Sequence, residues 1–549
     1  MRSVSTLLAF TVLTAHAARA QKTFNDIEYV DVGNIKAAVA LHGDLWWDPA
    51  KAEPRCEFPK GNGTHVSHVS ALWYSGYDGV GQMHTAAQTY RQSGNDIWPG
   101  PVPPDAATAN ALSESWGRVW KVNKSDITTF KALSTHTLAN TPAPILEWPA
   151  KNNAHAKGRN GATLTITTAM APFVDVNGDG SYDALAGDYP DIKGDQMLWW
   201  IFNDATGLHA NSQTENIGME VRAKAYAYNN SSLANIIFYE YEMTNTSVHN
   251  YSGFRCGLWT DVDLGYYNDD YIGFDSTRRM GMCFNGNAFD GVGAPTGEYH
   301  DSPPIMGVTL LELPGDNATT KVPAGSFMYF NNDNSVSGNP KNGTEFNHYL
   351  RSTFRDGRHL HNDFAPGVAS TGRGAGPDAN YIFNGDPTKN TEWSECAAGN
   401  IASDRRFVLA SNDFDFPAKS TKKFAFALVI TDTSHLNNCD SMKMGGILAL
   451  ADTAIRHYTI TPATGLGDVV KAQSKLQVYP NPAQDAVYIN IICNKATIHV
   501  YDVTGREVPV QVSPSATQVK IAIGHLARGM YHIIYNTAEG KQAGTFIKE

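Results

Sequence analysis

The chain has 549 residues, with 54 Asp and Glu against 43 Lys and Arg, and therefore a formal net charge of −11. This acidic balance disfavours nucleic acid as a partner, because neutralising phosphates requires clustered Lys and Arg. The surplus carboxylates are instead available for cations. The length exceeds one ordinary hydrophobic core and predicts three or four structural units at roughly 150 residues each.

The first twenty residues have the features of a signal peptide. Arg2 precedes an apolar run at residues 7–13, and Ala18-Arg19-Ala20 provides the small-x-small pattern that signal peptidase recognises. We therefore expect residues 1–20 to be removed and the mature chain to begin at Gln21. No later stretch of sequence reaches the roughly 18 uninterrupted apolar residues of a membrane helix, so we expect no membrane span.

Adjacent aromatic residues recur in the first 200 positions. The pairs are Trp46-Trp47, Trp73-Tyr74 and Trp199-Trp200. Aromatic faces stack well on the apolar faces of sugars, so these pairs are candidates for a sugar-binding platform. Neighbouring side chains on a strand point to opposite faces, however, and this favours the alternative that one ring of each pair is core.

An acidic loop at residues 175–188 is the strongest candidate for a metal site. The predicted ligands are Asp175, Asn177, Asp179, the backbone carbonyl of Ser181, Asp183 and Asp188. Calcium takes six to eight oxygen ligands, and Gly180 permits the sharp turn that such loops need. Ala186 occupies the position where an EF-hand has Glu, so Asp188, or alternatively Asp191 or Asp195, would supply that carboxylate. The loop resembles dockerin-like and thrombospondin-like calcium loops; the alternative is an Asx-rich turn.

The dominant period along the chain is two. Residues 219–228 alternate apolar and polar, and a polar turn at 229–232 joins them to the apolar run 236–243. Residues 163–167 and 424–430 have the same character. With 48 Gly and 27 Pro separating short runs, the sequence predicts an all-β protein, mainly of antiparallel β-sandwich domains with few helices.

A second, weaker acidic cluster follows the predicted hairpin. It comprises Asp261, Asp263, Asp269, Asp270 and Asp275. Like charges this close repel one another unless a cation or water lies between them, which makes a second calcium site plausible. Two alternatives remain: Asp261 and Asp270 as the acid and base of glycoside hydrolysis, and an acidic hairpin loop without catalysis.

Other candidate motifs lack the partners that their chemistry needs. His65 with His68, and His359 with His361, have no third metal ligand at a recognisable spacing, and the sequence contains neither HExxH nor GxSxG. Five of the six cysteines precede the C-terminal segment, so at least one is unpaired there. Their connectivity does not follow from spacing; the preferred pairing is Cys256 with Cys283.

One amphipathic helix is predicted near the end of the passenger, the part of the chain that precedes the C-terminal segment. Ser441 can cap its N-terminus, and an apolar face repeats at Met444, Ile447, Leu448, Ala451 and Ile455. The expected organisation is a signal peptide at 1–20, β-rich passenger regions at 21–170 and 171–458, the latter carrying the acidic loops, a linker at 459–473 and a C-terminal domain at 474–549.

The C-terminal segment carries three motifs in a fixed order. They are YPNP at residues 479–482, YDVTGREV at 501–508 and LARGMY at 526–531, followed by a final Lys-Glu. In this order they resemble the type A C-terminal sorting domain of type IX secretion cargo from Bacteroidetes. The resemblance implies an immunoglobulin-like β-sandwich, export across two membranes to the outer surface or beyond, and partnership with the secretion machinery. It also implies removal of the tail by a sortase and, in many cases, anchoring to surface lipopolysaccharide.

The passenger also resembles a broader group of Bacteroidetes proteins with sorting tails. The shared phrases include Gly43–Asp48, Ala86–Pro101, Gly187–Pro190 and Ser403–Phe407. This resemblance supplies no activity for any residue. The sequence therefore favours a non-catalytic structural or adhesive surface protein stabilised by calcium. The alternative is a secreted hydrolase or glycan-binding protein that acts on extracellular polysaccharide or peptide.

Overall fold

The computed structural model divides the chain into two compact units, residues 1–462 and 463–549. It describes residues 25–91, 94–301, 303–317, 320–431, 443–460, 478–489, 497–502, 507–514, 518–537 and 540–549. The predicted signal peptide and Ser441 lie outside the described residues. So does the predicted linker, except for residues 459 and 460, which end a helix.

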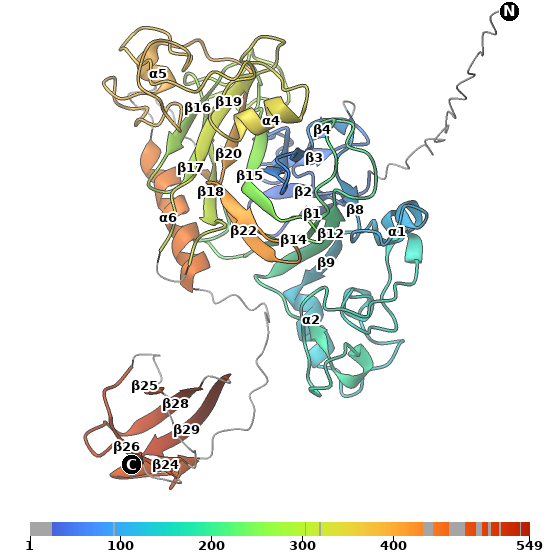
Figure 1. Cartoon of the computed structure of the whole chain (residues 1–549), viewed down its shortest axis with the longest axis vertical. Helices are drawn as coiled ribbons and strands as arrows, with labels where there is room; N and C mark the ends of the chain where they lie inside the picture. The colour runs from blue at the N-terminus through green and yellow to red at the C-terminus, as the bar shows by residue number, and fades with distance from the viewer. Residues whose placement is uncertain are drawn as a thin grey trace, which may run out of the picture. The chain divides into compact units, whose positions relative to one another are not determined.

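Two antiparallel sheets dominate the first unit (Figure 1). The larger sheet has nine strands in the order β16-β17-β18-β22-β14-β13-β12-β8, with β9 also paired to β12. Its strands are β8 (Trp98–Pro99), β9 (Trp120–Asn123), β12 (Gln196–Asn203), β13 (Met219–Ala227), β14 (Ile236–Asn245), β16 (Asp270–Asp275), β17 (Met280–Asn285), β18 (Ile305–Glu312) and β22 (Thr421–Thr431). The predicted hairpin is β13 and β14, which pair from Met219 with Asn245 to Ala227 with Ile237.

The second sheet has six strands in the order β19-β20-β15-β6-β7, with β21 also paired to β15. These are β6 (Val69–Tyr77), β7 (Met83–Ala87), β15 (Tyr251–Val262), β19 (Ser326–Asn331), β20 (Arg405–Ala410) and β21 (Phe414–Phe416). Both sheets take strands from either side of residue 170, so the two passenger regions fold together in one unit.

Smaller elements cover the sheets and connect them. The short strands are β1 (Ile27–Val30), β2 (Lys36–Ala40), β3 (Trp47–Asp48), β4 (Glu53–Pro54), β5 (Cys56–Glu57), β10 (Phe173–Val174) and β11 (Tyr189–Pro190). The helices are α1 (Ala109–Trp116), α2 (Lys124–Lys131), α3 (Ala143–Leu146), α4 (Gly343–Tyr349), α5 (Glu395–Ala398) and α6 (Met444–Ile460), with 3₁₀ turns at Arg159–Gly161 and Ala184–Ala186. None of the helices in the described part of the chain is long and apolar enough to cross a membrane.

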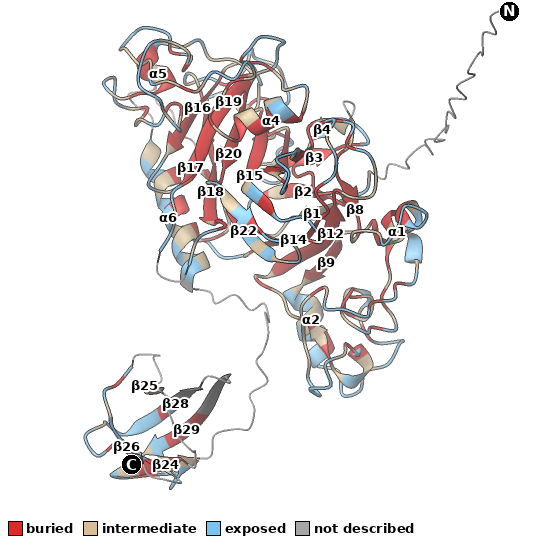
Figure 2. Ribbon diagram, viewed as in Figure 1, coloured by how far each residue is buried: buried red, intermediate tan, exposed pale blue. Residues whose placement is uncertain are grey.

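Most residues of the large sheet are buried (Figure 2), and their side chains belong to two cores, one on each face. Along β22, Phe424, Phe426 and Leu428 contribute to the core that includes the second sheet. The alternate residues of β22, from Ala425 to Val429, belong to a second core with α6. Small side chains at 425 and 427 allow the helix to lie close to the sheet. The helix prediction is confirmed, because Ile447 and Ala451 of its predicted apolar face are buried there.

The second unit is the predicted C-terminal β-sandwich. Its sheets have the orders β23-β24-β27-β26 and β25-β28-β29. The strands are β23 (Val478–Tyr479), β24 (Ala486–Ile489), β25 (Thr497–Asp502), β26 (Gln511–Pro514), β27 (Val519–Ala522), β28 (Gly529–Thr537) and β29 (Gly540–Lys548). Val487 and Ile521 of one sheet share a core with Val500, Ile533 and Phe546 of the other. The all-β prediction is confirmed in both units.

Replacing Phe426 by Ala should destabilise the first unit by about 3–5 kcal/mol, because it removes a fully buried ring that stacks on Tyr239 at 4.8 Å between centroids. Lys423→Ala, at an exposed position of the same strand, is the control and should change stability by less than about 0.5 kcal/mol. Urea unfolding followed by tryptophan fluorescence isolates this unit, since all 11 Trp residues precede residue 394. A loss of less than about 1 kcal/mol in Phe426→Ala would contradict this two-sided core.

Candidate functional site

The acidic loop 175–188 connects the two strands of a short hairpin. Val174 of β10 pairs with Tyr189 of β11, which places Asp175 and Asp188 next to each other at the base of the loop. Gly178 and Gly180 have φ of 74° and 77°, a left-handed conformation that favours glycine. The loop therefore turns back on itself through the left-handed backbone at these two glycines.

Carboxylates in this loop accept hydrogen bonds from its own backbone. Asp175 accepts from the amides of Gly178 and Gly180, both at 2.7 Å. Asp188, which is fully buried, accepts from Val176 and Asp183, both at 2.8 Å. Burial raises the pKa of Asp188, and the charges of Asp175 and Asp179 raise it further. Three carboxylates therefore lie close enough to influence one another.

The other predicted members of this loop are held by polar contacts. Asn177 donates to Asp179 at 2.9 Å, and the Ser181 hydroxyl accepts from Asn152 at 2.9 Å. Asp183 caps the 3₁₀ turn that follows, through the amide of Leu185 at 2.8 Å. Of the alternatives to Asp188, Asp195 is engaged elsewhere, at 3.3 Å from the Lys124 ammonium. Asp188 is thus the carboxylate positioned at the loop.

The second acidic cluster is divided among three places. Asp261 and Asp263 lie at the end of β15 beside His68. Asp269 and Asp270 lie at the start of β16. Asp275 ends β16, where it forms an ion pair with Arg278 at 2.7 Å. Asp270 and Asp275 stand at opposite ends of β16, five steps of extended strand apart, a span of roughly 16 Å. These five carboxylates therefore do not form one site.

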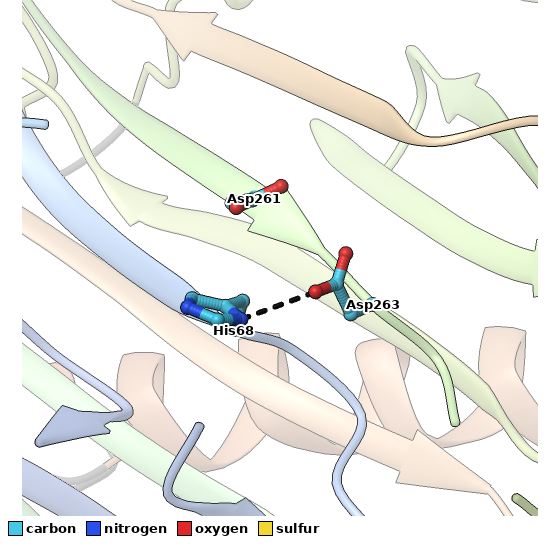
Figure 3. A group of neighbouring side chains, drawn as sticks. All are labelled: His68, Asp261 and Asp263. Carbon is cyan, nitrogen blue, oxygen red and sulfur yellow. Dashed lines mark hydrogen bonds and ion pairs between the residues drawn. The ribbon is translucent and has the colours of Figure 1, made fainter. Parts of the chain in front are cut away.

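His68, Asp261 and Asp263 form a compact group (Figure 3). Their nearest ligand atoms all lie within 4.8 Å of one another, and within the described residues this is the one such group of three or more His, Cys, Asp or Glu side chains. The Nδ1 atom of His68 lies 3.2 Å from Asp263 Oδ2. Because β6 and β15 pair antiparallel, with Val69 opposite Asp261, the sheet itself brings these side chains together.

Asp261 belongs to a buried charge network. It is 1% exposed, accepts a hydrogen bond from the Tyr90 hydroxyl and lies 3.1 Å from the Arg406 guanidinium. Burial and the charge of Asp263 raise the pKa of Asp261 to about 7 despite the opposing charge of Arg406. A carboxyl with this pKa exchanges protons near neutral pH, whereas the positive charge of Arg406 opposes a metal ion bound at Asp261.

Proton affinity differs between the two neighbouring histidines. Burial lowers the pKa of His68, but the hydrogen bond to Asp263 and the charge of Asp261 outweigh burial, so this pKa lies above the ordinary value. Burial and the charge of Arg55 lower the pKa of His65 below that value. The group around His68 therefore fits proton transfer better than it fits metal binding by His65 and His68 together.

Burial of the aromatic pairs rules out the candidate sugar platform and extends the favoured alternative, that one ring of each pair is core, to both rings. Trp46, Trp47, Trp73, Tyr74, Trp199 and Trp200 are each at most 1% exposed. Both rings of each pair are core because both faces of their strands are covered; Trp200 contributes to the core between the sheets and Trp199 to the core on the other side. No sugar can stack on rings that solvent does not reach.

The predicted disulfide between Cys256 and Cys283 is also wrong. Both residues are buried free thiols, and they lie on β15 and β17, in different sheets. Cys396 is disulfide-bonded.

His359 and His361 each contact a different nearby group. His361 Nε2 lies 3.3 Å from Asp378, and His359 Nδ1 lies 2.9 Å from the Leu360 carbonyl oxygen.

Comparison with known proteins identifies the second unit. Residues 477–549 match the family model described as the secretion system C-terminal sorting domain. No curated protein matches the chain. A solved polysaccharide lyase structure is 7% identical over 60% of this chain, with a TM-score of 0.18, and the match covers 34% of that protein. The chain thus spans about a third of that structure's length.

The sorting domain establishes the route and destination of the protein. The match supports a cargo of the type IX secretion system that interacts with the secretion machinery and is secreted or displayed at the cell surface, as the C-terminal motifs predicted.

Replacing His68 or His65 by Asn should change the pH dependence of stability in opposite directions. A raised pKa stabilises the fold below the unfolded value, about 6.5, and this contribution disappears as pH rises through the folded pKa. His68→Asn should therefore cost more stability at pH 5 than at pH 8. His65 has a lowered pKa, so its contribution is present above the unfolded value and is lost as pH falls. Urea unfolding at both pH values measures this, and changes of the same sign in the two variants would contradict the assignment.

Proposed function

We propose that the chain is a non-catalytic structural or adhesive protein of the cell surface whose acidic connection at residues 175–188 is stabilised by calcium. A signal peptide at residues 1–20 would direct the first export step, and a sortase would remove the tail. Surface lipopolysaccharide or an extracellular glycan would be its contact outside the cell.

The loop carries the calcium proposal. Its glycines and backbone hydrogen bonds hold Asp175 and Asp179 near the buried Asp188. Asn177 and the Ser181 carbonyl supply further oxygens at the spacing that calcium loops use. Bringing these anions together costs free energy that a bound cation offsets, and a ligand that binds only the folded state stabilises it by mass action.

The structural role is supported by how the chain uses its aromatic residues. The largest fully buried side chains are eight tryptophans and four tyrosines. Among them, Trp73 stacks on Trp259 at 5.6 Å between centroids and contacts Phe346 of α4. These side chains pack in the cores on the two faces of the large sheet. Such a core suits a surface scaffold whose connecting loops form the binding surface.

Replacing Asp175 and Asp179 by Ala should weaken calcium binding by at least about tenfold, because two anionic ligands are lost from a site that needs several. Millimolar calcium should raise the melting temperature of the parent and raise that of the variant less. The control replaces Asp301 and Asp415, two exposed carboxylates, and removes the same charge. Since extracellular modules bind calcium at roughly 10⁻⁴ to 10⁻³ M, calorimetric titration must reach about 10 mM. Equal binding by parent and variant would show that the loop is only a turn.

A hydrolase is the second candidate, and the Asp261 group favours it. Asp261 has a pKa of about 7, as a general acid or base requires, while His68 and Asp263 have side chains 24% and 20% exposed that solvent can reach. These residues are the ones through which an activity on extracellular polysaccharide or peptide would operate.

Asp261→Asn tests the hydrolase directly. If the chain cleaves any member of a panel of glycans and peptides, the variant should lose about 10²-fold to 10⁴-fold of that activity, because Asn transfers no proton. Asp415→Asn, which removes an exposed charge, should retain it. Activity that survives in Asp261→Asn would exclude this group as its source.

A further inference from the structure

A cavity of about 370 Å³ opens between three segments of the first unit. They are residues 26–28 at the start of β1, residues 117–119 between α1 and β9, and the turn at residues 158–161. Small-molecule sites commonly have roughly 300–1,000 Å³, so this cavity can hold about one or two sugar rings. Among the described residues that line it, none belongs to the loop 175–188 or to the group around His68.

One edge of the Arg118 guanidinium is held in place beside the cavity. Its Nη1 atom donates to Glu147 Oε2 at 2.8 Å and to the Lys157 carbonyl oxygen at 2.9 Å. The guanidinium also lies over the Trp120 ring, 5.7 Å from its centroid. Nε and Nη2 have no hydrogen-bond acceptor among the described residues. Arg118 thus lines the cavity as a planar donor that is already oriented and still has N–H groups to offer.

The carboxylates of the lining balance its guanidiniums. Asp26 accepts from Arg159 Nε at 2.6 Å. Glu28 accepts from the Tyr29 amide at 2.8 Å and lies 3.4 Å from the Lys121 ammonium, in both cases through Oε1. Its Oε2 accepts no hydrogen bond in the described part of the chain. The cavity therefore combines two carboxylates with two guanidiniums, and Glu28 keeps one oxygen for a ligand.

Apolar and backbone groups complete the wall. Ile27 and Val119 are half-buried, and both line the cavity. Gly158 allows the turn to lie against the end of α1, because an added Cβ would be 1.8 Å from the Ser115 carbonyl oxygen. At the exposed side, Asn160 has a φ of 52° and an amide side chain without a hydrogen-bond partner among the described residues. Planar polar groups and apolar patches thus lie around one space.

We propose that this cavity binds a neutral saccharide outside the cell, through Arg118, Glu28 and Asn160. The inference rests on the proposed adhesive role and assigns the glycan contact of that role to these residues. Guanidinium, carboxylate and amide groups donate to and accept from neighbouring sugar hydroxyls, while Ile27 and Val119 contact the C–H groups of the ring. None of the described residues that line the cavity is aromatic, so stacking contributes nothing to this binding.

An acidic ligand is the competing occupant. A uronate or phosphate group would accept from Arg118, but it would also place a negative charge beside Asp26 and Glu28. A sugar hydroxyl can accept from Arg118 and donate to Glu28 without adding charge. The balanced lining therefore favours the neutral ligand.

The experiment measures binding of the full chain without residues 1–20 to three sets of immobilised probes. They are neutral oligosaccharides, uronic acid oligosaccharides and the lipid-free polysaccharide of lipopolysaccharide. Chelator is present, so that calcium at the loop 175–188 has no effect. At least one neutral saccharide should bind, and calorimetry then gives its affinity. Retention by the third set as well would identify lipopolysaccharide as a source of the same sugar chemistry.

Two variants test the assigned residues. Glu28→Gln should weaken binding at least about tenfold, because it removes a charged acceptor. Asn160→Gly should weaken it at least about threefold, and glycine suits the left-handed backbone, so the variant folds. The matched controls are Glu215→Gln and Asn152→Gly, at exposed positions outside the lining, the latter with a φ of 62°. Both controls should bind as the parent does, and all four variants should keep its melting temperature within a few degrees.

Three outcomes overturn the proposal. Equal binding by the parent, Glu28→Gln and Asn160→Gly removes this cavity but leaves an adhesive contact elsewhere on the chain. Preferential binding of uronic acid oligosaccharides that is lost in the same variants replaces the neutral ligand by an acidic one. Binding of no saccharide removes both the cavity and the proposed glycan contact, whereas the calcium titration of the loop 175–188 tests the rest of the proposed function separately.

Discussion

The two-sided burial of the nine-stranded sheet is the constraint on which the rest of the first unit depends. Each strand needs one apolar face for the second sheet and another for α6 and the segment before β12. In β22 this requirement appears as large side chains such as Phe426 alternating with small ones such as Ala427. Charged side chains within the sheet, such as Lys224 with Glu242 and Glu240 with Lys193, are paired with opposite charges. The carboxylates without such a partner lie at strand ends and in connections. The candidate sites all occur there.

Carboxylates at these ends fall into two electrostatic classes. Glu395 with Arg405 at 2.8 Å and Asp261 with Arg406 at 3.1 Å have a permanent cation beside them. Such pairs offset each other's loss of hydration when the geometry is good. In the described residues Asp188 accepts hydrogen bonds from backbone amides, and the charges of Asp175 and Asp179 add to its raised pKa. A bound cation favours the ionised form of such a group, so this second class, and not acidity in general, marks the loop where calcium is proposed to act.

Local patterns in the sequence predict local structure well here. The hairpin at 219–243, the apolar face of α6 and the C-terminal β-sandwich were each predictable because every residue involved lies within a few positions of its partners. The loop 175–188 is equally local, because the strands on either side of its fourteen residues pair with each other. Its calcium chemistry stays a prediction.

Long-range pairing determined what the sequence could not predict. Asp261 and Asp275 are near in sequence but belong to different strand ends, whereas Tyr90 and Arg406, which surround Asp261, lie 171 and 145 residues away. The sugar platform suggested by the aromatic pairs is ruled out for a related reason. Alternation along a strand shows that side chains point to two faces of the sheet, but it does not show that both faces are covered.

The free energy of calcium binding limits how much the cation can stabilise the fold. At about 1 mM calcium and a Kd of roughly 10⁻⁴ M, one site stabilises the folded state by about 1.4 kcal/mol. Loss of a single core ring costs about 3–5 kcal/mol. Calcium at the proposed loop is therefore too weak to decide whether the sheets form, yet sufficient to order an acidic connection whose carboxylates otherwise repel one another. The core would be assembled independently of the cation, and the surface that the connections present would depend on calcium outside the cell.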